Sequence, residues 1–329
     1  MSNKESIVIT GGTGFIGSHL TELMIKEGYK VTVFDRYNPN NDWGWLEQSE
    51  YKNDCNIILG DIRDYDSVHK ALSGCDAVLH LAALIGIPYS YISPLAYIRT
   101  NIEGTYNVLE AAKAYGLDQV LITSTSEVYG SAQYSPIDER HPLVGQSPYS
   151  ATKISADQLA ISYWRSFDLP VKIVRPFNTY GPRQSARAIV PTVISQLLRG
   201  KEEISLGNLT PTRDLTFVKD TCAGFHQIFS GTSFLGEVTN IGMNEEISMG
   251  DLASLIANLM GKKISIIHSS QRVRGHQTEV DQLICDNSRL LSDSKWKPEY
   301  SLTSGLQETI DWMGKGENLR RYKEERYNV

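Results

Sequence analysis

Short apolar runs alternate with longer segments of helical period through the first half of the chain. The runs are rich in β-branched residues and cover Ser6–Thr10, Lys30–Phe34, Asn56–Leu59, Asp76–Leu81, Gln119–Thr123 and Val171–Val174. Helix-length stretches such as Phe15–Glu27 and Pro94–Tyr115 lie between them. Buried strands that alternate with helices are typical of βαβ units, in which helices cover both faces of a parallel sheet. The pattern therefore predicts an α/β fold with a doubly wound parallel sheet.

The alternation loosens after about residue 180, where prolines interrupt longer connections. Helical period returns in two segments near the end of the chain, at Met249–Met260 and Thr303–Met313. We therefore expect a smaller C-terminal α/β lobe that binds substrate. The expected sheet domain covers residues 1–180, with 217–242 returning to it, and the lobe covers 181–216 and 243–329.

Length, charge and cysteine spacing narrow the class of protein. The chain has 329 residues, more than the ~250–300 at which a single core stops growing, which agrees with an added lobe. An excess of 38 acidic over 32 basic residues, without a long basic run, argues against binding of nucleic acid or of a membrane surface. No apolar stretch approaches the ~20 residues of a membrane span, and no signal-peptide pattern opens the chain. The 4 cysteines form no CxxC pair, so we expect free thiols, no metal site and a cytoplasmic protein.

A glycine-rich turn follows the first predicted strand. Gly11, Gly14 and Gly17 stand three positions apart where the first helix begins. In a Rossmann-type sheet such glycines allow a tight turn, close approach of a pyrophosphate and close packing of helix on strand. Asp35 ends the second predicted strand, where a carboxylate accepts hydrogen bonds from an adenosine ribose and repels a 2′-phosphate. The pattern predicts NAD as the cofactor and keeps NADP as the alternative, since Arg36 stands beside Asp35.

Tyr149 and Lys153 are four residues apart on a predicted helix that continues to about Phe167. This spacing places both side chains on one face of the helix. A neighbouring ammonium favours the phenolate, so Lys153 is expected to lower the pKa of Tyr149 towards the working pH. Tyr149 is therefore a candidate base for a substrate hydroxyl. A non-catalytic dinucleotide-binding protein would typically have lost one of the two residues, and both are present.

Three more polar residues follow the fifth predicted strand, namely Thr125, Ser126 and Glu127. Ligands of open parallel sheets bind outside the carboxyl ends of the strands. We therefore expect these side chains to face the same crevice as Tyr149. Glu127 is the candidate for a second acid or base.

Four segments together resemble the extended short-chain dehydrogenase/reductases that modify nucleotide sugars. They are the glycine turn Gly11–Gly17, the strand end Thr125–Glu127, the pair Tyr149 and Lys153, and Arg175–Arg183. Within that superfamily the chain looks like the NAD-dependent 4,6-dehydratases of N-acetylglucosamine nucleotides, which serve routes to sugars such as QuiNAc and legionaminic acid. This finer resemblance is carried by Asn40–Leu46, Leu81–Tyr91, Ser124–Gly130, Gln146–Lys153 and Leu209–Asp214.

The resemblance implies a redox-neutral reaction on UDP-N-acetylglucosamine or its GDP equivalent. Tyr149, assisted by Lys153 and Thr125, would deprotonate the sugar 4-hydroxyl while hydride passes from C4 to NAD⁺. The resulting ketone acidifies the C5 proton, which Glu127 would remove. The C6 hydroxyl then leaves as water and hydride returns to C6, so that a 4-keto-6-deoxy sugar is formed.

Ser126 departs from many 4,6-dehydratases, which carry an Asp here as the acid for the departing hydroxyl. A serine hydroxyl is too weak an acid to replace it. Either Glu127 both removes the C5 proton and delivers it to the leaving oxygen, or a water held by Ser126 relays it. GDP-mannose dehydratases also resemble this chain in their Thr-Ser-Glu, so serine is compatible with dehydration.

The same serine keeps two rival reactions open. One is UDP-glucuronate decarboxylation, and the other is a dehydratase variant that releases the 5,6-ene or the C5-inverted product. Decarboxylases need a positive group near the C5 carboxylate, and the loop Ile85–Tyr91 contains no Arg or Lys. We therefore expect a neutral sugar. A plain 4-epimerase is disfavoured because it needs no carboxylate at Glu127.

The resemblance also assigns binding residues. Those expected to bind the cofactor are Gly11, Gly14, Phe15, Ile16, Gly17, Asp35, Arg36, Asp61, Ile62, Leu81, Ala82, Ala83, Asn101, Thr123, Tyr149, Lys153 and Pro176. Asp61 is placed at the adenine amino group or at a helix cap. Those expected to bind the nucleotide sugar are Tyr89, Ser90, Asn178, Val190, Arg213, Arg272 and Arg274. Arginines suit this function because the guanidinium binds phosphate oxygens in pairs.

Two further expectations concern surfaces. Relatives pair two subunits through the helices that correspond to Pro94–Tyr115 and Ser147–Phe167, so we expect a homodimer. Trp43 and Trp45 follow the second predicted strand. They are candidates either for covering the cofactor or substrate or for packing.

Overall fold

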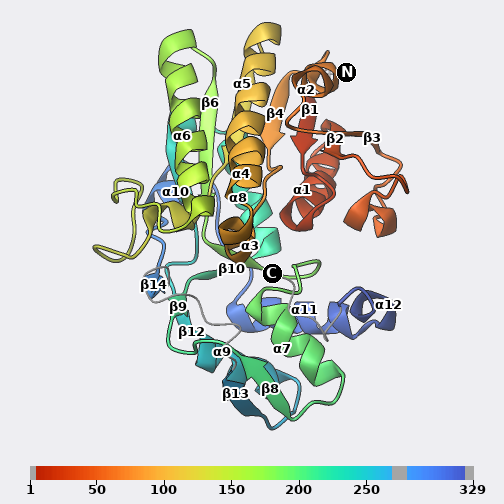
Figure 1. Cartoon of the computed structure of the whole chain (residues 1–329), viewed down its shortest axis with the longest axis vertical. Helices are drawn as coiled ribbons and strands as arrows, with labels where there is room; N and C mark the ends of the chain where they lie inside the picture. Colours follow the sequence, from red (N-terminus) through yellow and green to blue (C-terminus); the bar gives the residue numbers. More distant parts are fainter. Residues whose placement is uncertain (1–4, 269–279, 323–329) are drawn as a thin grey trace.

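The computed structural model describes residues 5–268 and 280–322 of the chain (Figure 1). Its centre is a 7-stranded sheet in the order β11-β6-β5-β4-β1-β2-β3, and every neighbouring pair in it is parallel. The strands are β1 (Ser6–Thr10), β2 (Lys30–Arg36), β3 (Cys55–Gly60), β4 (Ala77–His80), β5 (Gln119–Thr123), β6 (Val171–Pro176) and β11 (Val238–Ile241). The predicted doubly wound α/β fold is therefore confirmed.

Both faces of the sheet are buried, as the unbroken apolar runs predict. In β1, Ile7 and Ile9 pack on the face covered by α1 (Phe15–Lys26) and α8 (Val218–Ser230). Val8 points to the other face and joins the second core. Helices α2 (Tyr65–Leu72), α5 (Gly104–Tyr115) and α6 (Pro148–Phe167) cover that face, with α5 and α6 side by side in Figure 1.

Most of the elements that follow β6 form a lobe at one end of the sheet (Figure 1). The lobe begins where β6 ends, because β7 (Asn178–Tyr180) follows after one residue and pairs with β10 (Leu215–Phe217). Its helices are α7 (Ile189–Leu198), α9 (Met249–Leu259), α11 (Leu302–Gly314) and α12 (Gly316–Leu319), whereas α10 (Ser288–Asp293) packs against β11 of the sheet. Its other strands are β8 (Glu203–Leu206) paired with β13 (Ser265–His268), and β12 (Ile247–Ser248), β9 (Thr212–Arg213) and β14 (Gln282–Leu283) in one small sheet.

One apolar core joins the lobe to the sheet. The apolar cluster on the α1 and α8 face of the sheet contains Ile7 and Leu20. It also contains Leu252 and Ile256 of α9 and Leu306 of α11. All of these side chains are essentially inaccessible to water. The lobe therefore shares its packing with the α1 and α8 face of the sheet.

The segment Pro94–Tyr115 differs from the single helix that its periodicity predicts. It contains α4 (Pro94–Tyr97), a π-helical stretch at Ile98–Glu103 and then α5, and a short helix α3 (Ile87–Ile92) precedes it. The wider π turn carries Asn101, which is buried and hydrogen-bonded outside its own helix. π turns inside helices are frequent at functional sites.

No helix in the described part of the chain combines the length and the apolar character that a membrane span requires. The longest is α6, which has 20 residues. Its sequence includes Lys153, Asp157 and Arg165 among many polar residues.

Candidate active site

The glycine turn is held against the end of β4. Gly11 has φ +72°, and a Cβ there would lie 2.9 Å from the backbone nitrogen of Ala82. A Cβ on Gly17 would lie 2.1 Å from the Gly11 oxygen, so only glycine fits. At Gly14 the nearest atom would be the Gly11 oxygen at 3.3 Å, and no other heavy atom lies within 4 Å. The turn is therefore tight at two glycines and open at the third.

This geometry fits a dinucleotide pyrophosphate. Helix α1 begins directly after Gly14, which makes no side-chain cap, so the first N–H groups of the helix are available to an anion. Asp35, at the end of β2, accepts hydrogen bonds from the backbone N and the Oγ1 of Thr13 at 2.9 and 2.6 Å. A carboxylate fixed beside the turn suits a ribose diol and repels a phosphate.

The adenine side of the expected site carries an ion pair. Asp61 is bound by Arg63, whose Nη2 lies 2.5 Å from Oδ2. Hydrogen bonds from the Arg63 side chain lower the pKa of the Asp61 carboxyl, although both side chains are exposed. Ile62 is buried against the start of α5, where a Cβ on Gly104 would lie 3.0 Å from its Cγ2. Arg36 is exposed at the end of β2.

Helix α6 brings Tyr149 and Lys153 to the end of β5. The helix starts sharply because Ser147 and Ser150 form a reciprocal capping box and Pro148 occupies the first turn. Lys153 is buried, and its Nζ donates to the Thr123 carbonyl at 2.5 Å. Burial lowers the pKa of Lys153 to about 8, and the negative charge of Asp157 opposes this shift.

The pKa of Tyr149 moves in the direction opposite to the one expected from Lys153. Burial raises the pKa of Tyr149, and the negative charge of Glu127 raises it further. A hydrogen bond with Thr125 opposes this increase. The sequence-based expectation considered the pair of charges and left out the loss of water around a fully buried phenol. Thr125 is thus within hydrogen-bonding reach of the Tyr149 phenol, and the charge of Glu127 acts on it.

A short 3₁₀ helix, η3 (Ser126–Tyr129), fixes the strand end. The Oγ1 of Thr125 accepts the backbone N–H of Glu127 at 3.3 Å and caps this helix. Glu127 is half-buried and Ser126 is buried. The predicted group Thr125, Glu127, Tyr149 and Lys153 is therefore assembled in one place, with a carboxylate and a phenol at the same end of the sheet.

Asn101, expected at the cofactor, is committed to the protein itself. Its Oδ1 accepts the Leu84 N–H at 2.9 Å, and its Nδ2 donates to the Leu84 carbonyl and to the Oγ1 of Thr152 at 3.0 Å each. It thereby fixes the segment Leu81–Leu84, which includes Ala82 and Ala83, beside the glycine turn. Thr123, in contrast, keeps a buried Oγ1 without a hydrogen-bond partner among the described residues.

Tyrosines line the substrate side. The ring of Tyr97 lies edge-on to that of Tyr149, with 6.2 Å between centroids, and Tyr89 lies 6.1 Å from Tyr97. The Tyr97 hydroxyl donates to the Gly86 carbonyl at 2.5 Å. Ser90 is buried, and its hydroxyl donates to the Ile87 carbonyl within α3.

The other expected substrate residues differ in their surroundings. Asn178 has a buried Oδ1 that lacks a partner among the described residues, as a ligand-binding group would. Val190 is part of the apolar core. Arg213 is nearly buried on β9, and its Nη1 donates to the Thr212 carbonyl at 2.8 Å. Arg272 and Arg274 lie outside the described residues.

Arg187 is a site residue that the sequence reasoning missed. It lies on the connection between β7 and α7, and its Nη1 is 2.6 Å from where a Cβ on Gly86 would stand. It is exposed and forms no ion pair within the described ranges. Burial raises the pKa of Tyr97 and the charge of Arg187 opposes this, so the guanidinium acts on the tyrosine beside Tyr149. The Arg187 guanidinium therefore borders the loop Ile85–Tyr91, whose own sequence contains no Arg or Lys.

The tryptophans after β2 pack against the lobe. The Trp45 backbone N–H donates to the Thr13 carbonyl at 3.1 Å, and the Trp45 ring lies edge-on to Trp312 of α11 at 5.5 Å. Trp43 is half-buried against the core. The contacts favour the packing role and tie the glycine turn to α11.

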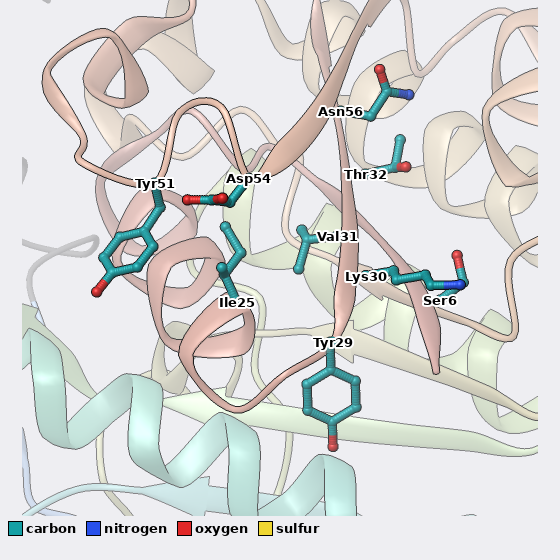
Figure 2. A pocket seen from close by; sticks show the side chains of 9 residues that line it. All are labelled: Ser6, Ile25, Tyr29, Lys30, Val31, Thr32, Tyr51, Asp54 and Asn56. Atoms are coloured by element: carbon teal, nitrogen blue, oxygen red, sulfur yellow. The ribbon is translucent and has the colours of Figure 1, made fainter. Parts of the chain in front are cut away.

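The described residues form a pocket away from this group and no metal-binding cluster. A pocket of about 630 Å³ lies at the amino ends of β1, β2 and β3. Figure 2 shows the side chains that line it, among them Ser6, Lys30 and Asn56. It lies at the edge opposite to Tyr149 and shares no residue with the group described above. Among the described residues, no group of three or more His, Cys, Asp or Glu could hold a metal ion.

Comparison with known proteins agrees with this geometry. A family model described as GDP-mannose 4,6 dehydratase matches residues 8–309. The chain is 33% identical to the UDP-N-acetyl-alpha-D-glucosaminuronate decarboxylase of Bacillus cytotoxicus, over 96% of this chain and 99% of that protein.

Solved structures of nucleotide-sugar enzymes also resemble this chain. The chain superimposes on UDP-glucuronic acid 4-epimerase from Bacillus cereus, solved with UDP-glucuronic acid and NAD, with a TM-score of 0.84, 31% identity and coverage of 94% and 98%. It also superimposes on dTDP-glucose 4,6-dehydratase from Bacillus anthracis, solved with NAD, with a TM-score of 0.83, 28% identity and coverage of 97% and 100%. The chain therefore belongs to the GDP-mannose 4,6-dehydratase-type family of extended short-chain dehydrogenase/reductases, whose members act on nucleotide sugars.

Proposed function

We propose that the chain is an NAD-dependent nucleotide-sugar 4,6-dehydratase, a hydro-lyase, and that its substrate is UDP-N-acetylglucosamine or GDP-N-acetylglucosamine. The observation that carries this proposal is that Glu127 and Tyr149 lie at the same end of the sheet, after β5, where the negative charge of Glu127 acts on the Tyr149 phenol. C4 oxidation alone needs only the tyrosine. A second, carboxylate base at the same place supplies what removal of the C5 proton requires.

The residues of this chain divide the reaction between them. Tyr149 accepts the proton of the sugar 4-hydroxyl, and Lys153, anchored on the Thr123 carbonyl, stabilises the phenolate with its charge. The glycine turn Gly11–Gly17 would hold NAD, which would supply a hydride acceptor for C4 and a hydride donor for C6. Glu127 then takes the C5 proton, made acidic by the adjacent ketone. The C6 hydroxyl leaves as water.

The acid for the departing hydroxyl is assigned to Glu127. Ser126 is buried and is too weak an acid for this step. The same carboxyl that gained the C5 proton can pass it to the C6 oxygen on the same face of the sugar, which completes a syn elimination. The alternative is that a water molecule held by Ser126 relays the proton. A dehydratase variant would instead release the 5,6-ene, without return of hydride to C6, or a product inverted at C5.

Mass spectrometry of product mixtures tests the proposal. Purified protein is incubated separately with UDP-, GDP- and dTDP-hexoses and with their N-acetylated forms. We expect the mass of one water to be lost from an N-acetylglucosamine nucleotide, with no net NADH. Accumulation of NADH over an intact sugar would contradict the proposal, and loss of water from a dTDP-hexose alone would correct the substrate.

Arg187 favours a second candidate function, the decarboxylation of a UDP-uronate. A guanidinium beside Gly86 supplies the positive charge that such a substrate needs, although the loop Ile85–Tyr91 has none of its own. The decarboxylase relative of Bacillus cytotoxicus supports the same candidate. Release of carbon dioxide from UDP-glucuronate or UDP-N-acetylglucosaminuronate would decide for it.

Replacement of Arg187 by Gln separates the two substrate classes. If the guanidinium binds a sugar carboxylate, KM for a UDP-uronate rises by about 10- to 100-fold, the effect of losing a charged hydrogen bond, while KM for a neutral nucleotide sugar changes little. The readout is KM for both substrates. Arg165→Gln, an exposed change in the last turn of α6, is the control. An equal rise for both substrates would place Arg187 on the diphosphate.

We infer that the protein forms a homodimer in the cytoplasm. Exposed apolar residues gather on α3, α4, the π turn, α5 and α6, and they include Ile92, Leu95, Ile98, Tyr106 and Phe167. Such a patch is typical of a subunit interface. None of the 4 cysteines, all within the described residues, forms a disulfide, which suits a reducing compartment. Sedimentation equilibrium should give twice the chain mass, and a monomer at micromolar concentration would contradict the inference.

A further inference from the structure

A buried ion pair lies beneath the active-site end of β5. Asp157 of α6 and Arg175 of β6 are 0% and 2% exposed, respectively. The Nε and Nη2 of Arg175 both donate to Oδ2 of Asp157, at 3.1 and 2.9 Å. The other carboxylate oxygen has no hydrogen-bond partner among the described residues. Burying such a pair costs desolvation free energy, and hydrophobic replacements are often equally stable, so its presence is weak evidence for a purely stabilising role.

The pair is attached to both ends of the catalytic segment Thr125–Glu127. Before the segment, the Oγ of Ser124 donates to Asp157 Oδ2 at 2.8 Å. After it, the Nη1 of Arg175 donates to the Tyr129 hydroxyl at 3.0 Å, and that hydroxyl donates to Asn240 of β11 at 2.7 Å. Ser124, directly before Thr125–Glu127, and Tyr129, two residues after it, are therefore held by one charge pair.

The pair also faces the tyrosine and lysine. Tyr149, Lys153 and Asp157 follow one another at intervals of four along α6, so they share one face of the helix. The charge of Asp157 raises the pKa values of both Lys153 and Tyr149. Among the other titratable groups, Glu127 and Tyr97 act on Tyr149, Lys153 acts on His80 of β4, and Arg175 interacts with both Asp157 and Tyr129.

We propose that Asp157, oriented by Arg175, is a positioning residue of the active site, which aligns the Thr125–Glu127 segment with Tyr149 and keeps Lys153 in its charged form. Asp157 is fully buried, so it acts through Ser124 and Arg175, which bond to it, and through its charge on Lys153. Its loss leaves Lys153 subject to burial and to the unpaired guanidinium, both of which disfavour the ammonium. The alignment part of the proposal rests on the proposed function, and the effect on Lys153 does not.

Asp157→Asn tests the effect on Lys153 without any substrate. The protein is prepared with NAD and lysine labelled with ¹³C at Cε, and Lys153→Met assigns the resonance. We expect the pKa of Lys153 to fall by about one unit, a tenfold change in its protonation equilibrium. Lys172 is an internal control, because it is buried at the opposite end of the sheet, donates to the Ile228, Phe229 and Gly231 carbonyls, and has a pKa also lowered by burial, to about 8. An unchanged titration of Lys153 in the variant would overturn the proposal.

Turnover tests the alignment. In Asp157→Asn we expect kcat to fall at least about tenfold with little change in KM, and the alkaline limb of the pH profile to move to lower pH by about one unit. Asp220→Asn is the matched control, since Asp220 is a buried carboxylate that accepts the N–H groups of Glu299 and Tyr300 in the lobe. A uniform loss of kcat at every pH, equal to that of Asp220→Asn, would reduce Asp157 to a packing role.

A double variant keeps the test valid if Asp157→Asn does not fold. Asp157→Asn with Arg175→Met removes both charges together, so that no unpaired guanidinium remains buried. We expect it to fold, to retain the loss of kcat because Tyr129 loses its donor, and to show a smaller shift of the alkaline limb. Full kcat in this variant would overturn the proposal. If the wild type acts on no nucleotide sugar, the proposed function fails, while the Lys153 titration still decides the role of Asp157.

Discussion

Glu127→Gln abolishes dehydration while C4 oxidation persists. The amide keeps the size and the hydrogen-bonding capacity of the half-buried side chain but cannot accept the C5 proton. We expect product formation to fall by about a thousandfold, within the range for a lost general base. The sugar should remain at the ketone stage, so a transient absorbance of reduced NAD is expected in a stopped-flow measurement with excess enzyme.

The measurement has a built-in control. The same trace reports hydride transfer, which does not need Glu127, and the mass spectrum of the product reports elimination, which does. Glu139→Gln is a second control, because Glu139 is a partly buried carboxylate that accepts the Asn240 N–H away from Tyr149. Unchanged turnover in Glu127→Gln would remove the observation on which the dehydratase proposal rests.

Tyr149→Phe stops the reaction one step earlier. Without the phenol no group is placed to accept the proton of the 4-hydroxyl, because Thr125 is a far weaker base and Lys153 is engaged with the Thr123 carbonyl. We expect loss of at least about a thousandfold in product formation, and no transient reduced NAD. The stopped-flow trace thus distinguishes this variant from Glu127→Gln, although both lack final product.

The ring of Tyr149 packs against Tyr97, so the phenylalanine variant retains the apolar contact and should fold. Tyr97→Phe is the matched control, since it removes a neighbouring hydroxyl that donates to the Gly86 carbonyl. Reduced NAD appearing in Tyr149→Phe at the wild-type rate would show that another group is the base.

The strands of the sheet were predictable because the pattern that marks each of them lies within a few consecutive residues. Each apolar run, such as Ser6–Thr10, is a strand buried on both faces, and the glycine spacing requires the observed turn at Gly11 and Gly17. The helix Pro94–Tyr115 was predicted as continuous because periodicity does not register the π turn, which is stabilised by contacts of Asn101 with the distant residues Leu84 and Thr152.

The site was predictable only where its members are close in sequence. Short sequence spacing identifies two pairs, Tyr149 with Lys153 and Thr125 with Glu127. Arg187 reaches Gly86 from a segment about a hundred positions away, and no local pattern links the two. The raised pKa of Tyr149 likewise depends on burial, which only the packed structure defines.

The apolar core shared by the sheet and the lobe bears on how ligands enter. Because Leu252 and Ile256 pack in the same cluster as Ile7 and Leu20, swinging the lobe away from the sheet would expose core surface on both sides. The free energy of such an opening approaches that of unfolding, and the two parts should melt in a single calorimetric transition. We therefore expect nucleotide sugar to be exchanged without a hinge movement between the lobe and the sheet.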